Sequence, residues 1–376
     1  MNISMITKFG IASVVAGLAT MANADTNADL QARIEQAEAR IAELTASNSD
    51  NWMNDQRAEE TRQLVHDVLA DADTRASMQG DGSPVTVNVH GFAQFRWSIN
   101  DTKQDAVTET HGFSLPAVRL EFDGDIYDWS YRVSGQWDDG GAFTLKDAYA
   151  DWNGFRVGQF KSPFMKEWLT YRADTLTADR SIVAYTFGQG RSQGIQYGYD
   201  FSSGLKFTAA YTDGFNSDNG AGVQNGYALT GRLDYEGAWF NLGAAVSHND
   251  LDVTDYNTWT VDASTSLRGF DFTSAYVAQS GDIGSNWATV LTAAYSMGKW
   301  QPFVQYQYGE LEGVTDNLSI GTFGVNYTVN ENIKWTTDLG YSFNTVDAGW
   351  NTDNTGWNTS SAEGEYLLRT QLQIRF

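Results

Sequence analysis

Residues 85–100 read VTVNVHGFAQFRWSIN, and their side chains alternate between two kinds. The first kind is apolar or small and comprises Val85, Val87, Val89, Gly91, Ala93, Phe95, Trp97 and Ile99. The second kind is polar and includes Thr86, Asn88, His90, Gln94, Arg96 and Ser98. A period of two indicates a β-strand with two different faces. Sixteen alternating residues exceed the usual strand of a soluble protein, so the stretch favours a tilted membrane strand that extends beyond the bilayer.

The same alternation recurs along the rest of the chain and predicts about sixteen strands. Besides 85–100 they are expected at 113–124, 129–137, 143–152, 155–161, 194–200, 205–213, 226–236, 238–248, 257–267, 270–279, 286–296, 299–310, 318–329, 332–345 and 364–376. Short links alternate with long ones at 101–112, 162–193, 213–225 and 346–363, as in barrels with periplasmic turns and extracellular loops. The predicted fold class is all-β: a transmembrane antiparallel β-barrel over residues 85–376, preceded by a short helical segment.

Two further patterns support a membrane barrel. The last strand alternates and ends on a C-terminal phenylalanine, Phe376, which resembles the terminal strand of outer-membrane barrels. The alternative for this strand is the edge of a soluble sandwich. Tryptophans recur at strand ends, where acyl chains meet headgroups, at Trp129, Trp239, Trp300 and Trp335.

The first 84 residues follow different rules. Residues 1–24 have a basic start, an apolar stretch and the sequence Ala22-Asn23-Ala24, which predict a cleaved signal peptide. Residues 25–79 are predicted to be a helical or coiled-coil segment, because Leu30, Ile34, Ala37, Ile41 and Leu44 share one a/d seam. This segment is either an oligomer-forming periplasmic stalk or a solvated spacer. Residues 80–84, GDGSP, form a linker.

Composition limits the chemistry. The chain has 47 acidic residues against 24 Lys and Arg, and a charge of −23 argues against nucleic acid as a partner. It has four histidines and no cysteine, and none of the histidines stands in a recognisable catalytic motif. We therefore expect no enzyme activity, no catalytic residue, no cofactor and no metal site. The rival hypothesis, an outer-membrane enzyme, would need a nucleophile with a fixed base.

Several stretches between residues 113 and 197 resemble one family. They are FSLPAVRLEFDG at 113–124, LKDAY at 145–149, RVGQFKSPF at 156–164, DRS at 179–181 and GIQY at 194–197. In order and spacing they are similar to the porin O/P family of outer-membrane porins, often described as phosphate-selective. The resemblance implies a homotrimer of sixteen-stranded barrels in the outer membrane, whose long third loop, here residues 162–193, folds inward. It also implies passive diffusion of small hydrophilic solutes or ions, with membrane lipid as the surrounding partner.

Basic residues concentrate where that constriction is expected. Of 18 Lys and Arg in residues 85–376, nine lie between 119 and 191: Arg119, Arg132, Lys146, Arg156, Lys161, Lys166, Arg172, Arg180 and Arg191. Guanidinium and ammonium groups bind phosphate, so these nine predict an anion-preferring or phosphate-preferring pore constriction.

Three alternatives remain open. The same stretch contains eleven acidic residues, and pairing with them would give a general or cation-leaning pore. An eighteen-stranded sugar porin is a second alternative. In the third, the barrel only anchors a structural tether, whose helical segment contacts peptidoglycan of the cell wall.

Overall fold

The structure, a computed structural model, describes residues 38–39, 85–101, 109–138, 141–217, 226–251, 254–353, 355–358 and 364–376. The chain divides into two compact units, residues 1–76 and 77–376, and nearly all of the described structure belongs to the second. The expected signal peptide (1–24), the linker (80–84) and all of the helical segment (25–79) except Glu38 and Ala39 lie outside the described residues. None of the described helices is long and apolar enough to cross a membrane.

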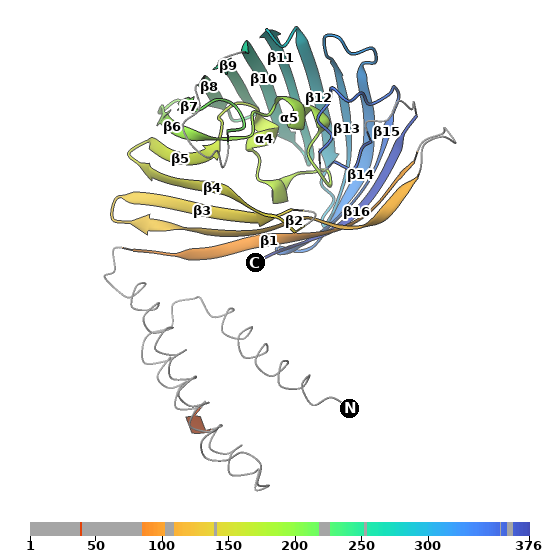
Figure 1. Cartoon of the computed structure of the whole chain (residues 1–376). Coiled ribbons are helices and arrows are strands. Elements are labelled where there is room, and N and C mark those ends of the chain that lie inside the picture. The colour runs from red at the N-terminus through yellow and green to blue at the C-terminus, as the bar shows by residue number, and fades with distance from the viewer. Residues whose placement is uncertain are drawn as a thin grey trace. The chain divides into compact units, whose positions relative to one another are not determined.

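Residues 88–375 form sixteen antiparallel strands that close into one barrel (Figure 1). The strands are β1 (Asn88–Asp101), β2 (Thr110–Ile126), β3 (Trp129–Trp137), β4 (Phe143–Trp152), β5 (Phe155–Lys161), β6 (Arg191–Asp200), β7 (Leu205–Thr212), β8 (Tyr227–Glu236), β9 (Asn241–Asp250), β10 (Asp255–Leu267), β11 (Phe270–Gly281), β12 (Asn286–Tyr295), β13 (Trp300–Glu310), β14 (Leu318–Asn330), β15 (Ile333–Ser342) and β16 (Tyr366–Arg375). The predicted fold class and strand number are confirmed, which removes the eighteen-stranded alternative.

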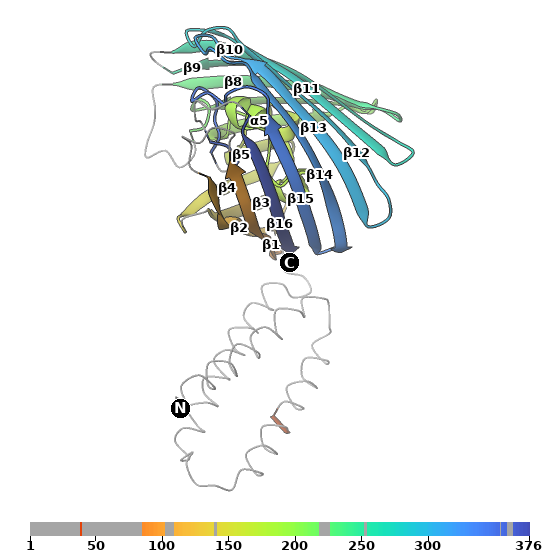
Figure 2. The ribbon, with the colours of Figure 1, turned by 90° about the vertical axis from the view of Figure 1, so that its right-hand side faces the viewer.

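Neighbours in sequence are neighbours in the sheet, so Figure 2 shows β11 to β16 side by side in one tilted wall. The connections that follow even-numbered strands are short, for example residues 127–128, 153–154 and 331–332. Those that follow odd-numbered strands are mostly longer, above all 162–190 and 343–365. We call the two ends of the barrel the turn end and the loop end.

The two faces of the strands differ as the alternation predicts. On β1, Val89 and Phe95 point outward and are 57% and 46% exposed, whereas Gln94 and Arg96 point inward and are buried at 0% and 4%. Aromatic rings meet in pairs on the outward face at both ends of the barrel: Trp129 with Trp152 and Trp300 with Tyr327 at the turn end, Tyr211 with Tyr227 and Trp259 with Tyr276 at the loop end. An apolar band between two aromatic girdles is the outward surface of a membrane barrel.

The last residue closes the barrel. The Phe376 N–H donates to the Gly91 carbonyl oxygen at 3.2 Å, and the Gly91 N–H donates to the Phe376 carbonyl oxygen at 2.9 Å. A Cβ atom on Gly91 would lie 2.2 Å from the carbonyl oxygen of Arg119 and 2.9 Å from the Phe376 ring. Glycine is therefore required at this junction of β1, β2 and the C-terminus.

A β-bulge interrupts the pairing of β3 with β4. Ser134 pairs with Asp147 and Gly135 with Leu145, so Lys146 is the extra residue. An extra residue shifts the alternation, and Lys146 and Asp147 consequently both contact inward side chains, Asp138 and Arg191. Without the bulge, alternation would place Lys146 and Asp147 on opposite faces of β4.

The long connection between β5 and β6, residues 162–190, lies inside the barrel (Figure 1). We call it the inward loop. It contains α4 (Lys166–Leu169), the 3₁₀ turn η1 (Arg172–Asp174) and α5 (Ile182–Phe187). Ser181 caps α5 by accepting a hydrogen bond from the Ala184 N–H. The loop is three residues shorter than expected, because β6 begins at Arg191 rather than at Gly194.

Candidate pore constriction

Hydrogen bonds join the start of the inward loop to its end. The Lys161 ammonium donates to the carbonyl oxygens of Trp168, Leu169 and Thr170 at 2.7, 3.2 and 3.0 Å. The Trp168 indole N–H donates to the Gly190 carbonyl oxygen at 2.9 Å. These bonds hold the start of the loop against its end, so the loop is a compact body rather than an open strand.

A buried polar junction attaches the loop to the wall. The Asp179 carboxylate accepts from Arg96 of β1 and from Arg172 of the loop, both at 2.9 Å. Next to it, the Ala178 N–H donates to Asp338 of β15 at 2.8 Å, and Asp338 pairs with Arg369 of β16 at 2.7 Å. Each charged group is paired and hydrogen-bonded, as a buried charge must be to avoid a large desolvation cost.

Burial and neighbouring charges shift the pKa values of three residues in the inward loop. Burial alone would raise the pKa of Asp179, but the charges of Arg172 and Arg96 hold that pKa well below its usual range. Burial raises the pKa of Tyr185, which donates to Asp179, to about 12. Burial also raises the pKa of Glu167, although Ser181 donates to its carboxylate through both its N–H and its hydroxyl. Asp179 therefore stays ionised at the junction.

An apolar contact holds the opposite side of the loop. The buried residues of α5 are Ile182, Val183, Ala184 and Phe187. They belong to one apolar cluster with inward-facing residues of the wall, among them Ala288 and Val290 of β12 and Leu318 and Ile320 of β14. The Ile182 N–H also donates to the Gln307 side chain of β13 at 2.8 Å. The inward loop therefore packs so closely against β12 to β14 that the contacting side chains of α5 and of the wall are all buried.

The opposite sector of the wall, β2 to β6, carries charge. Four of the nine predicted cations gather on these strands, and Arg180 of the inward loop lies beside them. We call the five the basic cluster: Arg119, Lys146, Lys161, Arg180 and Arg191. The charges of Arg180, Arg191 and Arg119 repel that of Lys161, and those of Arg191 and Arg119 repel that of Lys146. Five carboxylates approach the cluster. Asp147 lies 2.8 Å from Arg191, Asp138 lies 3.3 Å from Lys146 and Glu121 lies 3.7 Å from Arg119. The charges of Asp179 and Glu167 of the inward loop attract that of Arg180. Cations and carboxylates are thus balanced locally, whereas the whole protein is strongly acidic.

The other four predicted cations lie elsewhere. Arg132 of β3 faces the lumen, 36% exposed and 3.8 Å from Glu121. Arg156 pairs with Asp151 at 2.7 Å near the turn end and covers the Tyr149 ring. Arg172 belongs to the buried junction. Lys166 is exposed on α4, and its ammonium forms no ion pair with any carboxylate of the described residues.

Four inward arginines outside residues 119–191 were not among the predicted cations. Arg375 of β16 pairs with Asp174 of the inward loop. Arg96 and Arg369 hold the polar junction. Arg232 of β8 pairs with Asp234 and Asp262 and donates to the Phe164 carbonyl oxygen of the inward loop at 2.5 Å. Their positions on the polar face of alternating strands were the available signal.

His90 faces the lumen, where its ring nitrogens lie 3.4 Å from Glu121 and 3.2 Å from Asp123. Its neighbours are carboxylates and not a hydroxyl nucleophile. Within the described part of the chain, no three His, Asp or Glu side chains are arranged to hold a metal ion.

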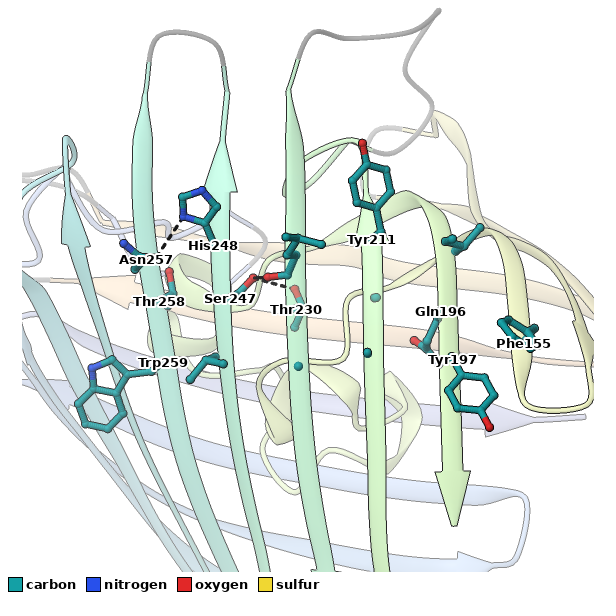
Figure 3. Close-up of a pocket in the computed structure, with 16 residues that line it drawn as sticks. Phe155, Gln196, Tyr197, Tyr211, Thr230, Ser247, His248, Asn257, Thr258 and Trp259 are labelled. Carbon is teal, nitrogen blue, oxygen red and sulfur yellow. Dashed lines mark hydrogen bonds between the residues drawn. The ribbon is translucent and has the colours of Figure 1, made fainter. Parts of the chain in front are cut away.

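A hollow of about 690 Å³ lies over β5 to β10, but on the outward face (Figure 3). Phe155, Tyr197, Tyr211 and Trp259 project around it, and all are exposed on the outer surface of the barrel. Its floor includes Ala209 and Gly231, whose small side chains leave the space open. The hollow belongs to the lipid-facing surface and is separate from the lumen.

A closed barrel of sixteen strands with an apolar outer band, a charged lumen and a loop folded into it defines the class of outer-membrane porins. The sequence profile of the family "Phosphate-selective porin O and P" matches residues 87–268. The match lies within the barrel and confirms the resemblance seen in the sequence.

Solved porins share the fold at low sequence identity. An anion-selective porin from Comamonas acidovorans superposes with a TM-score of 0.60 at 14% identity, covering 78% of this chain and 100% of that chain. Salmonella typhi OmpF in complex with daunomycin gives 0.60 at 16%, covering 77% and 97%. A loop L8 deletion mutant of OmpT from Vibrio cholerae gives 0.56 at 15%, covering 78% and 100%. No curated protein matches the sequence. Family and fold point to a channel rather than to an enzyme.

Proposed function

We propose that the protein is an outer-membrane porin through which small hydrophilic solutes diffuse passively, and that it prefers anions, including phosphate. The observation that carries the preference is the basic cluster, which brings five cations together at the inward loop of a strongly acidic protein. A pore selects by the charge at its narrowest ring. The family is named for phosphate selectivity, and the Comamonas acidovorans porin is anion-selective. Both support a preference for anions in this protein.

Reversal potentials test the proposal. The purified barrel in a planar bilayer under a KCl gradient should give the sign of an anion-preferring pore, and replacing chloride by phosphate should retain current. A unit charge about 8 Å away in water contributes about 0.5 kcal/mol. Lys146→Gln, in the basic cluster, and Arg132→Gln, which faces the lumen on β3, should therefore each lower the chloride-to-potassium permeability ratio roughly twofold, less at high salt. Arg268→Gln, in the turn between β10 and β11, is the matched control.

Two results would reject parts of the proposal. Clear cation preference of the unmodified protein would show that carboxylate pairing dominates, and the pore would then be a general or cation-leaning one. No conductance from a correctly folded barrel would reject the porin function and leave the structural tether.

The N-terminal part of the proposal concerns residues 25–79. We propose that the turn end faces the periplasm, that the helical segment lies there, and that the barrel assembles as a homotrimer, as the family resemblance implies. Deleting residues 25–79 should leave conductance intact, whereas a pure tether would lose its role in the cell wall. The mass of the detergent-solubilised protein with and without the segment tests the assembly, and a monomer would contradict it.

A further inference from the structure

A second loop folds into the lumen between β15 and β16, and its described residues are 343–353, 355–358 and 364–365. Its residues Val346, Trp350 and Trp357 are only 0%, 2% and 6% exposed. They belong to the same apolar cluster as α5 of the inward loop. Large side chains at the loop end of a barrel are expected to meet solvent or lipid, so their burial shows that this segment packs against the inner wall.

The indole rings of Trp350 and Trp357 each pack against a glycine of the inner wall. A Cβ atom on Gly309 of β13 would lie 2.7 Å from Trp350, and one on Gly340 of β15 would lie 2.5 Å from Trp357. Both glycines point inward and lie near the loop end of their strands. Each indole therefore occupies the volume that a side chain of the wall would otherwise fill. This fit distinguishes the contact from an accidental collapse of a long loop.

Polar bonds fix the same segment to its surroundings. Arg369 of β16 donates to the Thr355 carbonyl oxygen at 2.9 Å, and Asn100 of β1 donates to the Gly356 carbonyl oxygen at 3.1 Å. On the side of the inward loop, the Asn351 N–H donates to the Thr186 hydroxyl at 3.1 Å. The rings of Trp350 and Phe187 meet edge to face at 6.1 Å. The two loops thus form one continuous body across the sector from β12 to β16.

We propose that Trp350 and Trp357 build a second constriction, on the loop-end side of the inward loop, and that this constriction sets the largest solute that passes. The inference rests on the proposed porin function. Since both indoles are buried, they act by filling the lumen and not by touching the solute. The basic cluster lies on the other side of the lumen, on β2 to β6 and the inward loop. Size limit and ion preference are consequently determined by different residues.

Point variants test the second constriction. Trp350→Ala and Trp357→Ala should raise single-channel conductance, up to roughly twofold, because current grows with the water-filled cross-section. Swelling of liposomes in neutral sugars of increasing size should show a larger exclusion limit. The sign of the reversal potential should stay the same, since the basic cluster is untouched. Trp239→Ala, a 75% exposed tryptophan of the β8–β9 turn, is the matched control and should change neither property.

Substituting Gly340 in two backgrounds should change the conductance in opposite directions. Gly340→Leu alone should displace Trp357 and raise conductance, whereas in the Trp357→Ala background the leucine should fill the vacant volume and lower it. Heat-dependent mobility in gels verifies that each barrel is folded. Folded tryptophan variants with unchanged conductance and exclusion limit would overturn the inference, while an unmodified protein without conductance would instead overturn the proposed function.

Discussion

The lumen has two sectors that differ in what their strands present inward. On β2 to β6 many of the inward side chains are charged, some partly open to water, such as Arg132 at 36% and Lys146 at 18%, and some buried, such as Arg119. On β12 to β14 they include covered apolar residues, such as Val290, Leu318 and Ile320. The alternation of outward apolar residues is the same in both sectors. An apolar residue on the inward face therefore marks where a loop packs, whereas a charged one is either paired and buried, as in the polar junction, or open to water.

The largest effect is expected at the polar junction that separates the two sectors. Asp179→Ala leaves Arg96 and Arg172 buried without their shared carboxylate, which should cost about 3–5 kcal/mol. Thermal unfolding in detergent should shift to lower temperature, and the single-channel current should become noisy as the inward loop loosens. Asp174→Ala removes an acid of the same loop that is 53% exposed, so it should cost less than about 1 kcal/mol. Equal losses from both variants would contradict the assigned junction.

A smaller effect is expected in the apolar sector. Leu318→Ala creates a cavity between β14 and the inward loop and should destabilise the barrel by about 2–4 kcal/mol. Leu339→Ala is the control, because this leucine of β15 points outward and is 47% exposed. Denaturant unfolding of the two variants measures the difference. If Leu339→Ala proves the more damaging change, the apolar sector does not anchor the loop.

The smallest effect concerns pH. The folded pKa of Asp179 lies below its usual value, so its stabilising contribution is present above the ordinary aspartate pKa of about 3.9 and is lost as pH falls through the folded value. Between pH 7 and pH 5 the junction should therefore change by less than about 0.5 kcal/mol. Below pH 3 the unmodified protein should lose stability faster than Asp179→Asn, as read from unfolding midpoints. Parallel pH profiles would show that Asp179 is not the group responsible.

The strands were predictable because their alternation is local. The ranges 129–137, 143–152 and 155–161 match β3, β4 and β5 residue for residue. The expected 238–248 is shifted in β9, Asn241–Asp250, because the β8–β9 turn also contains apolar residues such as Phe240. The bulge at Lys146 was not predictable, since it follows from pairing with β3 rather than from the sequence of β4.

The site was predictable only in part. The concentration of cations in the sequence indicated the region of the basic cluster. The inward loop lacks the alternation of a strand, so the sequence could not distinguish Arg180, in the cluster, from Arg172, in the junction. The roles of Trp350 and Trp357 depend on Gly309 and Gly340, which lie 41 and 17 residues away in the sequence. Contacts of this kind are set by the closed tertiary structure.

The contact between Gly91 and Phe376 has a consequence for the order of folding. Each of the other fifteen strand pairs joins neighbours in sequence, whereas this one joins β1 to the end of the chain. Long-range pairing of this kind slows folding, because the chain must lose the entropy of a large loop before it gains the contact. Until that moment a nearly finished sheet still has two edges that can pair with other chains, and its final strand removes both together.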